Sequence, residues 1–143
     1  MTVYAETSAV LRWLFAEDRG EEIRAALARA DKVTCSRLTI LETRRVLRRA
    51  ERNGRISGED GAVILSLFME AAATWAILEM TPDVARRAED AFPVEPVRTL
   101  DAIHLASALL LGRALPELAI ASTDRRVRDN AGPLGFSKGL IPS

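Results

Sequence analysis

Short apolar segments alternate with longer stretches of mixed character along this chain. The short segments are rich in β-branched or apolar residues and bounded by polar ones, which predicts β-strands at residues 2–5, 33–35, 75–78 and 118–121. The stretches between them are rich in Ala, Leu, Arg and Glu and favour helices. Strands joined by helical crossovers predict an α/β fold with three layers, α/β/α, around a central, mainly parallel four- or five-stranded sheet.

Two of the expected helices are largely apolar. One spans residues 57–74, with Ser57 as its expected cap, followed by the apolar run 62–69. This run predicts a helix buried almost all round, with the alternative that part of it faces a partner protein or a second copy. The other spans residues 99–111 and is expected to begin at a Thr99 cap. Its apolar surface is interrupted only by Asp101, His104 and Ser107.

Length and composition fit one globular domain covering residues 1–143. The chain has 143 residues, 48% of them hydrophobic and 28% charged, which excludes disordered and collagen-like classes. Cys35 is the only cysteine, so no internal disulfide forms and a reducing compartment suits the protein. No apolar run approaches the roughly 20 residues of a membrane span, and the first ten residues lack signal-peptide character. We therefore expect a cytoplasmic protein without membrane association.

The charge pattern gives two conflicting indications about nucleic acid. The 20 basic and 20 acidic residues cancel, which argues against electrostatic binding over the whole surface. Residues 38–55, wound as a helix at about 100° per residue, nevertheless place a set of arginines within an arc of roughly 140°. That set comprises Arg44, Arg45, Arg48, Arg49, Arg52 and Arg55. This face suits an RNA backbone, although a simple solvated surface remains an equal alternative.

Four acidic residues are candidates for chemistry at one edge of the sheet. Glu6 directly follows the first strand and Asp124 closely follows the last, and ligands bind beyond the carboxyl ends of parallel strands. Glu42 lies in the helix after the second strand, and Asp101 opens a helix that is otherwise apolar. Taken singly, each has an ordinary alternative, such as capping by Asp124 or surface exposure of Glu42. Several carboxylates at one edge repel each other unless a cation joins them, which favours Mg²⁺ or Mn²⁺ and metal-assisted phosphodiester cleavage.

Competing kinds of site receive little support from the sequence. His104 is the only histidine, which excludes a histidine-rich zinc site, and we expect it to pack or hydrogen-bond on its own helix. Cys35 is expected to be a small buried residue. The chain lacks phosphate-binding glycine-rich motifs. An aspartyl-phosphate receiver would need a lysine near the last strand, and neither Lys32 nor Lys138 is placed for that role.

Four segments together resemble one known family. They are VYAETSAVLRWL, SRLTILETRRVLRR, LDAIHLASALLLG and IASTDRRVRDNAGPLGF, and they span the chain in the family's order. The sequence resembles the PIN domain, specifically the VapC-type toxin of toxin–antitoxin pairs. The resemblance implies a three-layer fold, a Mg²⁺- or Mn²⁺-dependent endoribonuclease acting on RNA, a homodimer, and inhibition by a small cognate antitoxin.

The resemblance also implies roles for individual residues. By motif position, the family's four catalytic acids correspond to Glu6, Glu42, Asp101 and Asp124. Metal binding falls to Glu6, Asp101 and Asp124, while Glu42 orients or activates the attacking water. The pocket and the RNA would also be contacted by hydroxyls and arginines of this chain, namely Thr7, Ser8, Ser122, Arg44, Arg45 and Arg48.

Position 6 departs from the family pattern, which usually has aspartate where this chain has Glu6. The additional methylene displaces the carboxylate, and a misplacement of about 1 Å can cost roughly a hundredfold in rate. We therefore expect attenuated activity. The alternative is a catalytically inactive, PIN-like protein-binding module that engages an antitoxin. Trp13 and Phe15 could join the apolar 62–69 segment in a groove for that partner, and an acidic stretch of antitoxin could use the arginine face.

Overall fold

The computed structural model describes residues 1–137, and its centre is a parallel four-stranded sheet. The strands are β1 (Thr2–Ala5), β2 (Lys32–Ser36), β3 (Ala76–Leu78) and β4 (Leu118–Ala121), in the order β3-β2-β1-β4. All three pairings are parallel. The predicted α/β fold and all four strands are confirmed, with small shifts at the ends of β2 and at the start of β3. Lys138 and the rest of residues 138–143 lie outside the described residues.

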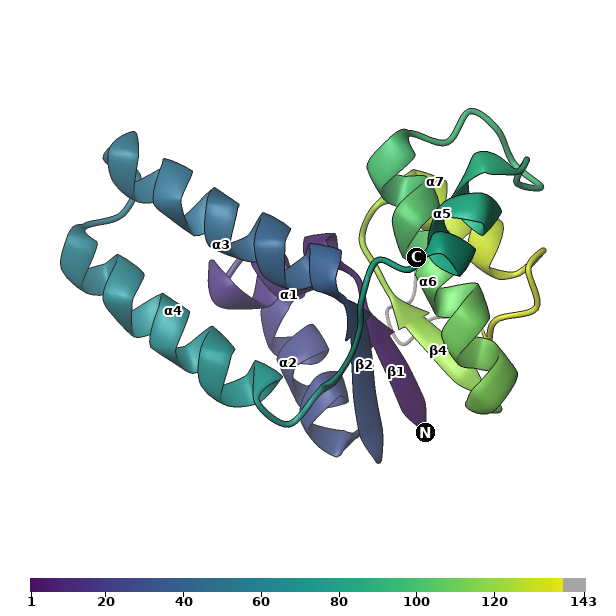
Figure 1. Ribbon diagram of the computed structural model, residues 1–143. Coiled ribbons are helices and arrows are strands. Elements are labelled where there is room, and N and C mark those ends of the chain that lie inside the picture. The colour runs from purple at the N-terminus through teal and green to yellow at the C-terminus, as the bar shows by residue number, and fades with distance from the viewer. Residues whose placement is uncertain (138–143) are drawn as a thin grey trace.

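Helices cover both faces of the sheet, which confirms the three-layer prediction (Figure 1). One layer contains α1 (Thr7–Leu14), α2 (Gly20–Arg29), α3 (Arg37–Arg52) and α4 (Gly58–Ala72). The other contains α5 (Pro82–Glu89), α6 (Thr99–Ala114) and α7 (Arg125–Ala131). The α3–α4 hairpin projects sideways from the sheet, as Figure 1 shows at the left.

The core is divided by the sheet because successive strand residues point to opposite faces. On β1, Val3 and Ala5 join the cluster with the first helical layer, whereas Tyr4 joins the cluster with the second. Both clusters are closed by fully buried side chains such as Phe68 and Leu105. Cys35 is buried as predicted, and burial raises the pKa of its thiol to about 12, so this cysteine is protonated and unreactive at neutral pH.

Local capping explains where most helices begin. The Ser36 hydroxyl accepts from Leu38 N at 3.0 Å, and the Ser57 hydroxyl accepts from Asp60 N at 3.0 Å, as expected for Ser57. Helix α6 differs from the prediction. Its cap residue is Arg98, whose carbonyl accepts from Ala102 N at 2.8 Å, so Thr99 is already helical and supplies no side-chain cap.

The prediction that the helix at residues 57–74 is buried almost all round is wrong. Only Gly61, Phe68 and Ala72 of α4 are buried, while Val63 is 64% exposed and Leu67 is 46% exposed. The reason is that α4 packs on α3 at the edge of the molecule, where no further layer formed by residues 1–137 covers its outer face (Figure 1). The alternative, in which part of the run is left for a partner, agrees better with this arrangement. No helix within residues 1–137 is long and apolar enough to span a membrane.

Candidate active site

The carboxyl ends of β1 and β4 are joined by a network around Glu6. The Glu6 side chain is 6% exposed, and its carboxylate accepts hydrogen bonds at Oε2 from Ser8 and, at 2.7 Å, from Ser122. The Ser8 hydroxyl in turn accepts from Thr123 N at 2.9 Å and Asp124 N at 3.2 Å. These bonds lock the segment after β4 onto the start of α1. Glu6 is therefore an oriented, buried carboxylate, and its alternative as an exposed turn residue is wrong.

Arg98 connects two of the predicted acids. Its guanidinium lies 2.9 Å from Asp101 Oδ2 and 3.1 Å from Asp124 Oδ2. The Asp101 side chain is 7% exposed, whereas that of Arg98 is 62% exposed. The pKa of Arg98 is raised above its ordinary value. The largest cause is the hydrogen bond to Asp101, and the charges of Asp101, Asp124 and Glu6 add to it. One long, exposed side chain thus pairs with two carboxylates at this edge of the sheet.

The loop before α6 holds Arg98 in place. The Asn130 side chain is fully buried and bonds both backbone groups of Val94, at 2.9 Å each. The Glu95 carboxylate accepts from Phe92 N at 3.0 Å and Val97 N at 2.7 Å. The backbone leading into Arg98 is therefore fixed by side chains of its own loop and of α7.

Glu42 reaches the same edge from α3. Its Oε1 accepts from the Thr7 hydroxyl at 2.6 Å and lies 2.7 Å from His104 Nε2. Burial acts to raise the pKa of the Glu42 carboxyl, but hydrogen bonds from His104 and Thr7 outweigh it and hold the pKa below its ordinary value. Glu42 is thus an ionised acceptor at neutral pH, and its alternative as a simple surface glutamate is wrong.

The hydrogen bonds of His104 differ from those that the sequence predicts. It is 2% exposed, as expected for a packed residue, but its hydrogen bonds leave its own helix. Nδ1 lies 2.8 Å from the Tyr4 hydroxyl on β1, and Nε2 reaches Glu42 on α3. The imidazole therefore ties α6 to the sheet and to α3 in the neighbourhood of Glu6, whose Oε1 is 3.8 Å from Nε2.

The structure brings together the predicted acids and hydroxyls but not the predicted arginines. Asp124 also caps α7 by accepting from Arg126 N at 2.8 Å, so its capping role is confirmed beside its ion pair with Arg98. The arginines Arg44, Arg45 and Arg48 are exposed along α3, beyond Glu42. Arg45 and Arg48 line a separate surface depression with Arg49, Glu51, Arg52 and Gly58.

Sequence reasoning did not identify Arg98, or Tyr4 and His104, as parts of this site. A signal for Arg98 is present, since an arginine three residues before Asp101 can pair with it across the first helical turn. The sequence contains no comparable signal for His104, because its hydrogen-bond partners lie on β1 and α3, far from it in the sequence.

The chemistry of the donor set fits a hard divalent cation. Carboxylates of Glu6, Asp101 and Asp124, with serine hydroxyls beside them, are the oxygen ligands that Mg²⁺ and Mn²⁺ accept. Their negative charge exceeds what Arg98 alone supplies. Within residues 1–137, however, no three Asp, Glu, His or Cys side chains stand at the spacing of a metal cage. Two of the acids are paired with Arg98 instead.

The sequence matches known proteins along most of its length. A profile of the PIN domain matches residues 3–133. Two Mycobacterium tuberculosis proteins, ribonuclease VapC45 of strain CDC 1551 and ribonuclease VapC49 of strain H37Rv, are each 31% identical to this chain over 133 residues. Each alignment covers 93% of this chain and 91% of the relative.

Solved structures show the same fold. A crystal structure of Mycobacterium tuberculosis VapC20, described as a sarcin–ricin loop cleaving toxin, matches with a TM-score of 0.65 at 15% identity, covering 95% of this chain and 97% of that one. PAE2754 from Pyrobaculum aerophilum matches with a TM-score of 0.62 at 18% identity, covering 97% of this chain and 82% of that one. With the profile spanning nearly the whole sequence and the 31%-identical ribonucleases aligned along it, the chain belongs to the PIN-domain family.

Proposed function

We propose that this protein is a VapC-type toxin: an endoribonuclease that cleaves RNA phosphodiester bonds with Mg²⁺ or Mn²⁺, forms a homodimer and is inhibited by a small cognate antitoxin. The observation that carries the proposal is the meeting of acids from four separate segments at the carboxyl edge of the sheet. Arg98 touches two of them, Asp101 and Asp124, and the charges of Glu6 and Glu42 act on the same guanidinium. Relatives of 31% identity are named ribonucleases, which supports this chemistry.

The residues divide into distinct roles in hydrolysis. Glu6, Asp101 and Asp124 would hold the cation, which when bound lowers the pKa of water and stabilises charge on the phosphate. Ser8 and Ser122 keep the Glu6 carboxylate oriented. Glu42 stays ionised and accepts a hydrogen bond from the attacking water. In the reaction water adds to phosphorus, the bond to the leaving oxygen breaks, and one proton passes from the water to that oxygen.

Arg98 has two successive roles in this proposal. It pairs with Asp101 and Asp124 in the structure, and if these carboxylates held a cation, its exposed guanidinium would be free to contact a phosphate oxygen. The arginine face of α3, including Arg44, Arg45 and Arg48, would contact the RNA backbone outside the pocket. Such contacts add affinity and position but do not select a sequence.

Removal of the divalent cation tests the proposed reaction. Purified protein, freed of any bound antitoxin, is expected to cleave RNA with Mg²⁺ or Mn²⁺ and to lose at least about a hundredfold of that rate when the ion is chelated. Gel analysis of a defined RNA measures the rate, and re-addition of excess ion is the control. Cleavage that persists with chelator would contradict the metal mechanism. Absence of cleavage with either ion would support the inactive binding module instead.

Replacement of Glu6 by aspartate tests whether the longer side chain limits activity. Glu6→Asp is expected to raise kcat with Mg²⁺ by about tenfold, because a displacement near 1 Å costs roughly a hundredfold and the serines recover only part of the orientation. Glu6→Gln, which keeps the length and removes the charge, is the matched control and is expected to lose activity. If Glu6→Asp brings no gain with either ion, attenuation by Glu6 is the wrong account.

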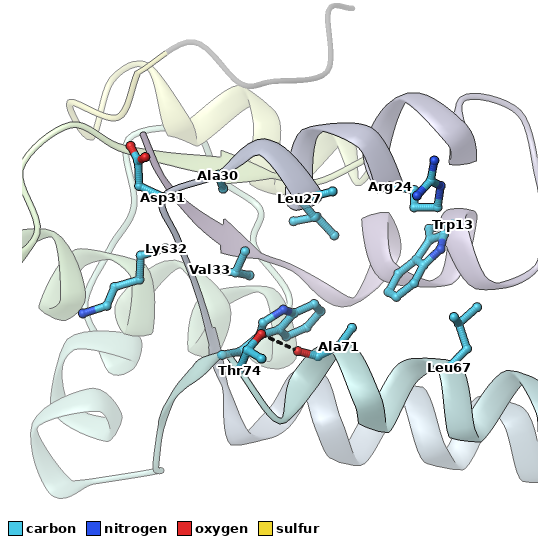
Figure 2. Close-up of a pocket in the computed structure, with 12 residues that line it drawn as sticks. Trp13, Arg24, Leu27, Ala30, Asp31, Lys32, Val33, Leu67, Ala71 and Thr74 are labelled. Atoms are coloured by element: carbon cyan, nitrogen blue, oxygen red, sulfur yellow. Dashed lines mark hydrogen bonds between the residues drawn. The ribbon is translucent and has the colours of Figure 1, made fainter.

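A pocket between α1, α2 and α4 is the proposed contact for the antitoxin. It has a volume of about 480 Å³ and is lined by Trp13, Leu27, Val33 and Leu67 among others. Figure 2 shows Trp13 and Leu67 facing each other across it, with Lys32 and Asp31 near the opposite end. Phe15 does not belong to this lining: it packs under the Arg55 guanidinium, 4.5 Å from the ring centre.

Substitutions in this pocket are expected to weaken antitoxin binding. Trp13→Ala and Leu67→Ala each remove part of the apolar lining and should raise the Kd for the antitoxin about tenfold or more, as measured by calorimetry. Val63→Ala is the matched control, since Val63 lies on the same helix, is 64% exposed and is not part of the lining. Unchanged affinity in both pocket variants, with the circular dichroism of the folded protein, would refute this contact.

A further inference from the structure

We propose that Tyr4 and His104 form a positioning pair that sets the orientation of the Glu42 carboxylate towards the reacting water. The inference rests on the proposed function and deepens it. It concerns three side chains from separate elements: Tyr4 on β1, His104 on α6 and Glu42 on α3. They form a continuous chain of hydrogen bonds of 2.8 Å and 2.7 Å through the imidazole.

The first link has a fixed direction. Glu42 Oε1 lies 2.7 Å from His104 Nε2, and a carboxylate oxygen only accepts, so Nε2 carries the proton of the imidazole. In that tautomer Nδ1 is an acceptor, and the fully buried Tyr4 hydroxyl donates to it at 2.8 Å.

The Glu42 carboxylate accepts two hydrogen bonds at one of its oxygens. Nε2–H donates to Glu42 Oε1, and the Thr7 hydroxyl donates to the same oxygen at 2.6 Å. The Glu42 side chain is 25% exposed, and since both donors contact Oε1, Oε2 is the oxygen available to a water molecule. Two donors on one carboxylate oxygen thus fix which oxygen is left to contact the water.

The position of Glu42 in the fold explains why such support is needed. Helix α3 belongs to the hairpin that projects from the sheet, whereas α6 and α7, at whose starts Asp101 and Asp124 stand, belong to the other helical layer (Figure 1). His104, 2% exposed, and Tyr4 join Glu42 to the rigid centre of the molecule. Mutation of the partners that orient the side chains of a metal site typically costs ten- to hundredfold in metal affinity or activity, and we expect the same scale for the partners of Glu42.

A matched pair of amide substitutions tests this positioning role by kinetics. The side-chain nitrogen of glutamine reaches the place of imidazole Nε2, whereas that of asparagine reaches only the place of Nδ1. His104→Gln should therefore keep kcat within about threefold of the parent, and His104→Asn should lower kcat by ten- to hundredfold with little change in KM. In a Glu42→Ala background, His104→Asn should cost less than about twofold more. Equal losses for both amides, or the full loss in the Glu42→Ala background, would overturn the proposal.

Nuclear magnetic resonance gives a readout that does not depend on RNA cleavage. The chain contains a single histidine, so ¹⁵N-labelled histidine reports His104 alone. We expect a protonated Nε2 and an unprotonated Nδ1, with the Nδ1 signal shifted in Tyr4→Phe. A proton on Nδ1 would overturn the proposal. If the parent protein cleaves no RNA at all, the proposed function fails, while the nitrogen spectrum still decides whether this hydrogen-bond chain exists.

Discussion

Asp101→Asn is expected to lower the rate of RNA cleavage by roughly a thousandfold or more while leaving the protein folded. Asp101 is the most enclosed acid that Arg98 contacts, with 7% of its side chain exposed. The amide keeps the size of the carboxylate but loses one oxygen and the negative charge that a divalent cation requires. The effect should fall on kcat, because Asp101 contributes to the charge at the reacting phosphate and not to the arginine face of α3.

Asp83→Asn is the matched control for this substitution. Asp83 also lies in the first turn of a helix, α5, but its side chain is 69% exposed and pairs only with neighbouring Arg86 at that surface. Cleavage of a defined RNA by both variants, together with Mn²⁺ titration by calorimetry, measures activity and metal affinity separately. Full activity in Asp101→Asn would show that the acids around Arg98 are not the catalytic centre.

Phe68→Ala is expected to destabilise the fold by about 3–5 kcal/mol. Phe68 is the one large side chain of α4 that is fully buried, and its ring packs edge-to-face on Trp75 with centroids 6.0 Å apart. Truncation leaves a cavity where the largest buried side chain of α4 enters the core, so the stability of the α3–α4 hairpin depends on it. Urea unfolding followed by tryptophan fluorescence measures the change in free energy.

Leu67→Ala serves as the control because it removes a neighbouring apolar side chain that is 46% exposed. Its cost should stay below about 1 kcal/mol, since nearly half of its surface is already in water and its removal leaves no enclosed cavity. Similar losses for the two variants would mean that the outer face of α4 is as well packed as its inner face, contrary to the structure.

The strands and the acids at their ends were predictable from the sequence for a common physical reason. A short β-branched or apolar run bounded by polar residues defines a strand locally, and parallel strands bring their carboxyl ends to one edge. Glu6 and Asp124 therefore fall together without knowledge of any contact. Ser57 was likewise identified by its own position before a helix.

The remaining features depend on packing between distant segments, which local pattern does not encode. The apolar run in α4 predicts burial, but whether a further layer covers Val63 depends on where the hairpin leaves the sheet. The hydrogen bonds of His104 depend on the register that places Tyr4 beneath α6. Arg98 lies beside Asp101 and Asp124 because Asn130 and the loop before α6 hold its backbone.

The strand order has a consequence for the timing of activity in a cell. β1 is made first but stands inside the sheet, between β2 and β4, so one of its edges stays open until residues 118–121 have left the ribosome. Ser122 and Asp124, which directly follow β4, emerge at the same stage. The acids after β1 and β4 therefore cannot come together until residues 118–124 have been synthesised, so a chain built in this order lacks its assembled site while most of residues 1–124 are being translated.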